Sequence, residues 1–232
     1  GNQDIIVRFR QRVREKIEGF NEGVYETQLA LLDVMEQNVE RFRETNPSIA
    51  NLLPNKPNKV ILSFTPGGDD RLSKVNRAFR PLSYHEFDLQ KGTKKLLMKG
   101  KTSMGQVRFN ADGFAWTARG FDRGTDEYLW YARQPGESDW QEIFRLHEDS
   151  FENFSVEGID HSKPDTIFVL AHNGRDKEAL WEFNIRTKSF GEIIYARSDV
   201  NIAGVRYHSN PWTHPDTVVG VGYFTDKLHF EY

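Results

Sequence analysis

The sequence predicts an all-β protein made of about five repeated sheets, each of four short antiparallel strands. Three observations predict this fold class. Strand-length apolar runs fill most of the chain, one hairpin pattern recurs along it, and Asn or Asp residues recur at a regular step. The chain has no cysteine, so neither a disulfide nor a thiol nucleophile is available to it.

The recurring hairpin is clearest in LWEFNIRTKSFGEIIY, where two apolar runs flank the polar residues Arg186, Thr187 and Lys188. This pattern is typical of two strands joined by a tight connection. Asp88 and Ala132 occupy the position of Asn184 when the copies are overlaid. The overlay predicts four hairpins, at 29–42, 84–100, 128–144 and 180–195.

An independent repeat lies upstream of the hairpins, where an Asn or Asp opens an apolar run. The steps between these positions are 54, 53 and 51 residues, which is too regular for coincidence. The four positions are Asn58, Asp112, Asp165 and Asp216. Turn residues separate these runs from further predicted strands at 105–110, 153–160 and 203–208. Each repeat therefore holds four strands.

A period near 50 residues with four strands per repeat is typical of β-propeller blades, which bury their faces by stacking on neighbouring blades. We therefore predict one incomplete β-propeller over 1–232, whose first blade lacks its innermost strand and whose last blade lacks its outermost. Blade-to-blade packing is the expected role of Trp116, Trp130, Trp140 and Trp181. The expected blades are 1–45, 46–100, 101–149, 150–197 and 198–232.

Two interpretations of the N-terminal segment stay open. Its apolar residues, from Ile6 to Val24, have the spacing of an amphipathic helix. Gly19 and Gly23 would each cost a helix about 1 kcal/mol relative to alanine, whereas they suit a hairpin connection. We favour strands.

Charge and hydropathy exclude several classes of function. The formal net charge of −3 comes from 31 basic and 34 acidic residues, so a basic surface for nucleic acid is not expected. The longest apolar stretches, such as 218–224, are far shorter than a membrane-spanning helix requires. We predict neither a nucleic-acid nor a membrane partner, and no cofactor.

Residues 25–232 resemble the N-terminal β-propeller of bacterial serine peptidases of the prolyl oligopeptidase superfamily, in the acylaminoacyl-peptidase-like group. The resemblance rests on the order and spacing of segments such as LPNKPNKVILSF, EYLWYARQPGESDWQEI and PDTVVGVGYFTDKLHFEY. It implies a propeller that precedes an α/β-hydrolase domain and admits only short peptides to its active site. The domain partner and the short peptides are therefore the expected partners.

The catalytic chemistry of that family does not carry over to this chain. Its nucleophile lies in a G-x-S-x-G turn, and the nearest string, GESDW around Ser138, has Trp140 where the second glycine is needed. The chain also has no adjacent Glu-Glu pair of the kind that dipeptidyl peptidases use to hold a substrate amine. We expect no catalysis by this chain alone, within a parent serine peptidase. The alternative is a self-standing binding or scaffold propeller, and the compartment stays open.

Candidate substrate-binding residues come from the strands expected nearest the propeller axis. Aligning QVRF, SVEG and GVRY puts Arg108, Glu157 and Arg206 in one register at 49-residue steps. An Arg-Glu-Arg row could hold the carboxylate of a peptide through the planar guanidinium groups. The competing interpretation is that the row ties neighbouring blades together by ion pairs, and we favour it.

Two further expectations concern the last repeat. His208, Trp212 and His214 gather in one connection near His161 or His172, but we expect these imidazoles to bond the backbone or face water and predict no metal site. The open edges of a truncated propeller invite strand pairing, so we predict self-association at one or both broken blades.

Overall fold

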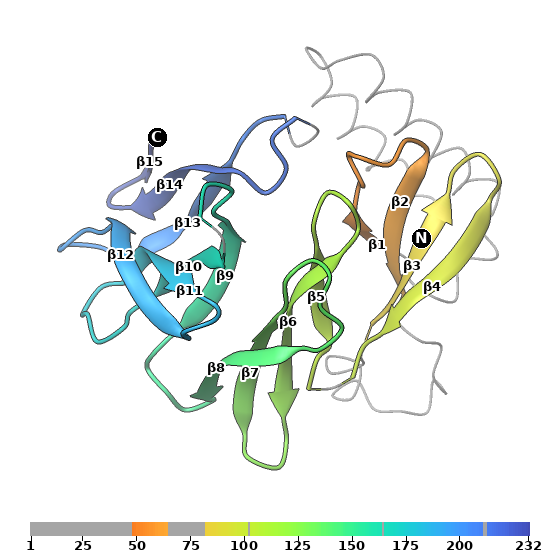
Figure 1. The fold of residues 1–232 in the computed structure, drawn as a ribbon. Coiled ribbons are helices and arrows are strands. Elements are labelled where there is room, and N and C mark those ends of the chain that lie inside the picture. Colours follow the sequence, from red (N-terminus) through yellow and green to blue (C-terminus); the bar gives the residue numbers. More distant parts are fainter. Residues whose placement is uncertain (1–47, 65–81, 102, 164, 211–212) are drawn as a thin grey trace. The chain divides into compact units, whose positions relative to one another are not determined.

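The computed structural model describes residues 48–64, 82–101, 103–163, 165–210 and 213–232 (Figure 1). The hairpin expected at 29–42 and the choice between helix and strand before Val24 lie outside these residues. The chain divides into two compact units, Gly1–Ala115 and Trp116–Tyr232. All regular elements of the described residues are β-strands, so the predicted all-β class is confirmed.

The strands form four antiparallel sheets in which neighbours in sequence are neighbours in space. The sheet orders are β1-β2-β3-β4, β5-β6-β7-β8, β12-β11-β10-β9 and β13-β14-β15. The strands of the first two sheets are β1 (Ser48–Asn51), β2 (Lys59–Phe64), β3 (Ser83–Asp88), β4 (Thr93–Lys99), β5 (Gln106–Phe109), β6 (Ala115–Asp122), β7 (Glu127–Ala132) and β8 (Gln141–His147). Those of the last two sheets are β9 (Phe154–Ile159), β10 (Thr166–Ala171), β11 (Ala179–Asn184), β12 (Ser189–Tyr195), β13 (Ile202–Tyr207), β14 (Val218–Phe224) and β15 (Leu228–Glu231).

The predicted hairpins form because the residue that ends the third strand closes the turn after it. Oδ1 of Asp88 accepts hydrogen bonds from the backbone N–H groups of Gln90 and Lys91, and Oδ1 of Asn184 accepts the same pair from Arg186 and Thr187. These are Asx turns, in which a short polar side chain replaces a backbone acceptor. The overlay of Asp88 on Asn184 is therefore a structural equivalence.

Ala132 occupies the same place at the end of its strand without being able to close the turn. It pairs with Gln141, the first residue of β8, just as Asn184 pairs with Ser189. The connection after it is longer, and Oε2 of Glu137 accepts a hydrogen bond from the backbone N–H of Gln134.

The regular Asn and Asp positions mark a backbone conformation. Asn58, Asp165 and Asp216 have φ values of 61°, 62° and 51°, in the left-handed region that Asn and Asp tolerate better than most residues. Asp112 differs from the other three, because the residue after it, Gly113, has the positive φ, at 78°. The regularly spaced Asn and Asp positions thus mark a left-handed backbone conformation just before the second strand of each sheet.

In the first unit, the core lies against β2 and β3. Val60, Leu62 and Phe87 are almost fully buried and pack together with Phe64 and Leu89. The hydroxyl of Tyr84 on β3 donates to the carbonyl of Gly105 at 3.0 Å and accepts the backbone N–H of Val107 at 2.8 Å. One tyrosine therefore connects β3 to the chain around β5.

In the second unit, successive sheets are joined by an aromatic cluster centred on Phe154 of β9. Its ring stacks on Phe144 of β8 at 4.1 Å and meets Trp130 of β7 edge-on at 5.3 Å. On the side of its own sheet it contacts Phe183 at 5.1 Å and Phe190 at 6.0 Å. Phe154 is 1% exposed, so burial of its ring holds two neighbouring sheets together.

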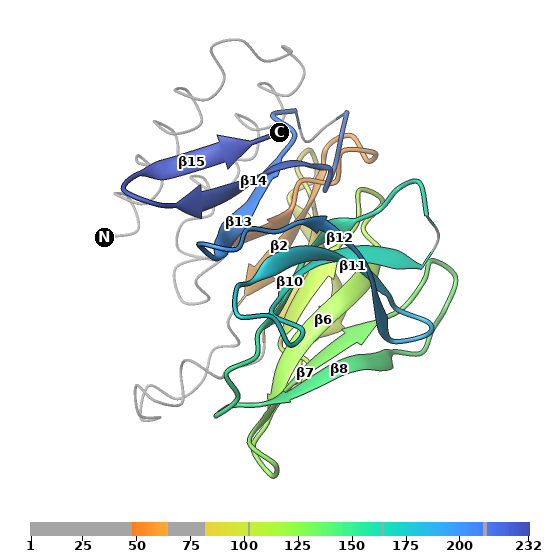
Figure 2. The ribbon, with the colours of Figure 1, turned by 90° about the vertical axis from the view of Figure 1, so that its left-hand side faces the viewer.

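The next sheet packs on this one in the same way (Figure 2). Leu170 and Leu180 of β10 and β11 form one buried cluster with Ile202, Val221 and Tyr223 of β13 and β14. Repeated antiparallel sheets that each stack on the next form an incomplete β-propeller, as the sequence predicted. The last sheet has three strands in the described residues, consistent with a truncated last blade.

The tryptophans play different roles. Trp130 packs between sheets, as predicted, whereas the recorded contacts of Trp181 are with Phe190 and the carbonyl of Ala171 in its own sheet. Trp140 lies under the guanidinium of Arg133, which is 4.5 Å from its ring centroid. Within the described ranges there is no helix long and apolar enough to cross a membrane.

Candidate functional site

The three predicted binding residues all lie on first strands of their sheets. Arg108 lies on β5 in the first unit, half-buried between the buried side chains of Val107 and Phe109. Glu157 on β9 and Arg206 on β13 lie in the second unit and are also half-buried. The binding role of the three residues stays a prediction.

Glu157 is held by two hydroxyl groups. The Ser155 hydroxyl donates to Oε1 of Glu157 at 2.6 Å. The hydroxyl of Tyr207, on β13, lies 2.7 Å from the main-chain oxygen of Glu157 and 3.3 Å from its Oε2. Glu157 is therefore a tie between neighbouring sheets, and its recorded partner on β13 is a tyrosine rather than an arginine.

The register around Glu157 is irregular. Val156 pairs with Val169 and Gly158 pairs with Phe168, so Glu157 is the extra residue of a β-bulge. A bulge re-aims side chains relative to a regular ladder. Equal sequence spacing therefore does not by itself place Glu157 and Arg206 on the same face.

Arg206 contacts aromatic rings. Its guanidinium carbon is 4.3 Å from the ring centroid of Phe230 and 5.3 Å from that of Tyr232. Arg206 pairs with Gly220 on the middle strand β14, and Gly220 has no side chain to separate β13 from β15. A cation over an aromatic face gains about 0.5 to 1 kcal/mol at an exposed site.

His208 and His214 of the last repeat lie together in one loop, and His161 of the preceding repeat contacts that loop. The rings of His208 and His214 lie 3.9 Å apart, and Nδ1 of His208 accepts the backbone N–H of Asn210. Nε2 of His161 lies 3.1 Å from the carbonyl oxygen of Pro215. In the part of the chain that the structure describes, no three His, Asp or Glu side chains form a group that could hold a metal ion.

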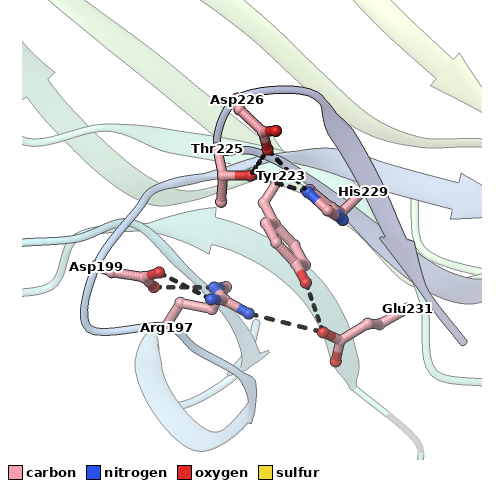
Figure 3. A network of polar contacts seen from close by, with 7 residues as sticks. All are labelled: Arg197, Asp199, Tyr223, Thr225, Asp226, His229 and Glu231. Carbon is pink, nitrogen blue, oxygen red and sulfur yellow. Dashed lines mark hydrogen bonds and ion pairs between the residues drawn. The ribbon is translucent and has the colours of Figure 1, made fainter.

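A polar network that sequence reasoning missed covers Tyr223 (Figure 3). Arg197 makes a two-pronged ion pair with Asp199, at 2.9 Å and 2.8 Å, while its guanidinium carbon lies 4.2 Å from the Tyr223 ring centroid. The Tyr223 hydroxyl donates to Oε1 of Glu231 at 2.7 Å. The network joins the β12–β13 connection to the β14–β15 hairpin. The close spacing of Arg197 and Asp199 is the feature of the sequence that could have indicated this network.

The charges of this network change the titration of its members. Hydrogen bonds from Tyr195 and Tyr223 lower the pKa of Glu231, and the bond to Glu231 raises the pKa of Tyr223. The hydrogen bond from Arg197 lowers the pKa of Asp199. Each shift favours the protonation state in which the hydrogen bonds of the network are made.

A second network connects the β7–β8 turn to the turn before β10. Oδ1 of Asp165 accepts hydrogen bonds from Nε2 of Gln134 at 2.8 Å and from Nε of Arg186 at 3.0 Å. Arg186 also pairs with Glu137 at 2.6 Å. The Asp165 carboxylate therefore joins two sheets.

Ser138 lies in the same β7–β8 connection, where it is exposed. Its main-chain oxygen accepts a hydrogen bond from Arg133 at 3.1 Å. The string around it is part of a hairpin connection and not of a strand-to-helix turn, which is the context that a G-x-S-x-G nucleophile requires.

The repeated antiparallel sheets define the class of protein, which is an incomplete β-propeller. No family model and no curated protein sequence matches the chain. Similar solved structures include a prolyl endopeptidase, with 17% sequence identity and a TM-score of 0.47 over 75% of this chain. Another is Sqt1 from Chaetomium thermophilum, with 16% identity and a TM-score of 0.35 over 76% of this chain.

The matched regions are parts of longer chains. They cover 25% of the prolyl endopeptidase chain and 40% of the Sqt1 chain. At these identities the likeness concerns the fold.

Proposed function

We propose that this chain is the non-catalytic propeller region of a prolyl-oligopeptidase-like serine peptidase. In this role it admits only short peptides to the active site. It also docks an α/β-hydrolase domain that lies outside the 232 residues. The support comes from the resemblance over residues 25–232, from the repeated four-stranded sheets, and from a sequence without a G-x-S-x-G string.

The observation that carries the proposal is the chemistry of the first strands. β9 and β13, both in the second unit, each carry a half-buried charged residue, Glu157 and Arg206. Half-buried charges of both signs suit a peptide with free termini, because guanidinium groups bind carboxylates and a carboxylate binds an amine.

The test is hydrolysis by the purified chain. We expect no turnover of chromogenic peptides or of acyl-amino-acid substrates. Turnover that a substitution within the chain abolishes would overturn the non-catalytic role.

The gene sequence tests whether the parent protein is a serine peptidase. A G-x-S-x-G serine followed by Asp and His is expected downstream of Tyr232. If the gene encodes no such residues, the chain is a self-standing binding or scaffold propeller instead.

A further inference from the structure

The connection between β10 and β11 contains Asn173-Gly174, the only Asn-Gly pair in the chain. Both residues have left-handed backbones, with φ values of 47° and 76°. The backbone N–H of Arg175 donates across them to the carbonyl of His172 at 3.0 Å. Two successive positive φ values inside such a bond are typical of a type I′ turn, for which Asn-Gly is a preferred sequence.

This turn holds a carboxylate that comes from another connection. Oε2 of Glu152, between β8 and β9, accepts the backbone N–H of Asn173 at 3.0 Å, and Oε1 accepts that of Gly174 at 3.2 Å. Adjacent backbone N–H groups that converge on one anion form a nest. The side chain of Glu152 therefore fills an anion-binding nest of its own chain.

An Asn-Gly pair is also reactive. The backbone nitrogen of Gly174 can approach Cγ of Asn173, because glycine has no Cβ and its backbone rotates easily. A bond from this nitrogen to Cγ forms, the bond from Cγ to the side-chain nitrogen breaks, and ammonia leaves with the proton of the Gly174 N–H. Water then opens the resulting succinimide to aspartate or isoaspartate. Water is thus the only other reactant.

Both residues are open to this chemistry. Asn173 and Gly174 are exposed to solvent, which supplies the water. Within the described ranges the side-chain amide of Asn173 makes no hydrogen bond that would fix its orientation, and the bond of this residue to Glu152 comes from its backbone. The Gly174 nitrogen, in contrast, is held by Glu152.

This hydrogen bond opposes the reaction. The Gly174 nitrogen has to lose its proton before it can attack. A carboxylate that accepts a hydrogen bond from an N–H group stabilises the protonated form, and its charge disfavours an anion on the nitrogen. The two bonds from Glu152 also hold the turn in its type I′ conformation, which limits the rotation that the attack requires.

We propose that Asn173-Gly174 is a succinimide-forming modification site, which the Glu152 carboxylate protects in the folded chain. Conversion at this site sets a second carboxylate beside Glu152, and isoaspartate also inserts a methylene group into the backbone of the turn. Like charges in contact repel each other, so the modified turn releases Glu152. The site thus couples a slow chemical change to the contact between two connections.

Mass spectrometry of the folded chain, during incubation at mildly alkaline pH, measures the conversion of the Asn173 amide to a carboxyl group. Chromatography separates the aspartate and isoaspartate products. Glu152→Gln removes the charge and should speed conversion about five-fold, the upper range for an exposed charge interaction. Glu148→Gln, at an exposed position in the same connection, is the matched control and should leave the rate unchanged.

A second variant separates protection of the N–H group from general loosening. Nδ2 of Asn153 donates to Oε1 of Glu178, so this pair also ties the β8–β9 connection to the β10–β11 connection. Neither residue bonds the Asn-Gly turn within the described ranges. Asn153→Ala should therefore leave the conversion rate unchanged. Acceleration equal to that of Glu152→Gln would show that Glu152 only holds the connection in place, and would overturn the proposal.

Unfolding provides a test that needs no variant. In urea sufficient to unfold the chain the contact with Glu152 is lost, so the parent should convert faster than when folded and at the same rate as Glu152→Gln. Three further results would overturn the proposal. They are equal rates for the folded parent and folded Glu152→Gln, a folded parent that converts as fast as the unfolded one, and a difference between parent and variant that persists in urea.

Discussion

The hydroxyl of Tyr207 donates a hydrogen bond to the main-chain oxygen of Glu157, fifty residues earlier in the chain, at 2.7 Å. This bond joins the first strands of two neighbouring sheets at the bulge where the ladder of β9 with β10 is interrupted. It supplies the inter-sheet tie that the sequence had suggested for an arginine. Its loss should therefore be measurable in the stability of the second unit.

Tyr207→Phe removes only the hydroxyl. We expect the free energy of unfolding to fall by about 1 kcal/mol, the usual net contribution of one hydrogen bond. Urea denaturation measures the change. Tyr232→Phe, on an 82% exposed side chain, serves as the control, and equal stability of both variants would contradict the tie.

Phe154→Ala should be far more damaging. The substitution empties the centre of the aromatic cluster between two sheets, and truncation of a buried Phe costs about 3 to 5 kcal/mol. Phe151→Ala, three residues earlier and fully exposed, should leave the denaturation midpoint within experimental error of the parent chain. A similar midpoint for both variants would show that the cluster does not hold the sheets together.

Asp165 combines a left-handed backbone with a carboxylate, and two substitutions separate these roles. Asp165→Asn keeps a residue that tolerates the φ of 62° and loses only the charge facing Arg186. We therefore expect the free energy of unfolding to fall by at most about 1 kcal/mol. Asp165→Ala also places alanine in the left-handed conformation, which alanine adopts less readily. It should therefore lower the free energy of unfolding by about 1 to 2 kcal/mol more than Asp165→Asn does. Thermal unfolding of the two variants measures the difference, and equal losses would assign the whole effect to the side chain.

Glu86 should make stability depend on acid pH. Hydrogen bonds from Lys59 and Lys56 lower its pKa in the folded protein below the ordinary value of 4.5. A depressed folded pKa contributes stability that is present above the unfolded pKa and is lost as the pH falls through the folded pKa.

The comparison of the parent chain with Glu86→Gln isolates this contribution. The difference in unfolding free energy should be largest above the ordinary pKa of a glutamate and should vanish once the pH has fallen through the lowered pKa of Glu86 in the folded protein. Glu148→Gln, at an exposed position after β8, is the control. A difference between the parent and Glu86→Gln that is constant from pH 3 to pH 7 would rule out the linkage.

The proposed peptide site predicts a dependence on the peptide terminus. Arg206→Gln should weaken the binding of a short peptide with a free carboxylate about ten-fold, the loss expected for a charge-assisted hydrogen bond. The same peptide with an amidated C-terminus should bind the parent and the variant equally. Calorimetric titration measures both affinities, and an unchanged affinity for the free acid would remove Arg206 from the site.

Much of the fold could be predicted because its signals are local. Asp88 and Asn184 each bond N–H groups two and three residues ahead, so a turn is recorded in a few adjacent letters. The left-handed residues before the second strands leave a similar record, because only a few residue types accept that conformation. The repeated sheets followed from these two signals.

The candidate site could be predicted only in part. The sequence placed charged residues on the first strands, but not the bulge at Glu157, the bond from Tyr207 or the rings that cover Arg206. It also missed the Arg197 network, whose members come from separate strands and connections.

By itself, the sequence determined which residues form strands, where the turns close and how often the unit repeats, because alternation and turn chemistry act over a few residues. Only the tertiary structure decided which side chains meet across sheets. A one-residue irregularity in a strand moves its side chains to the other face, and the partner of each residue then depends on packing between segments about fifty residues apart.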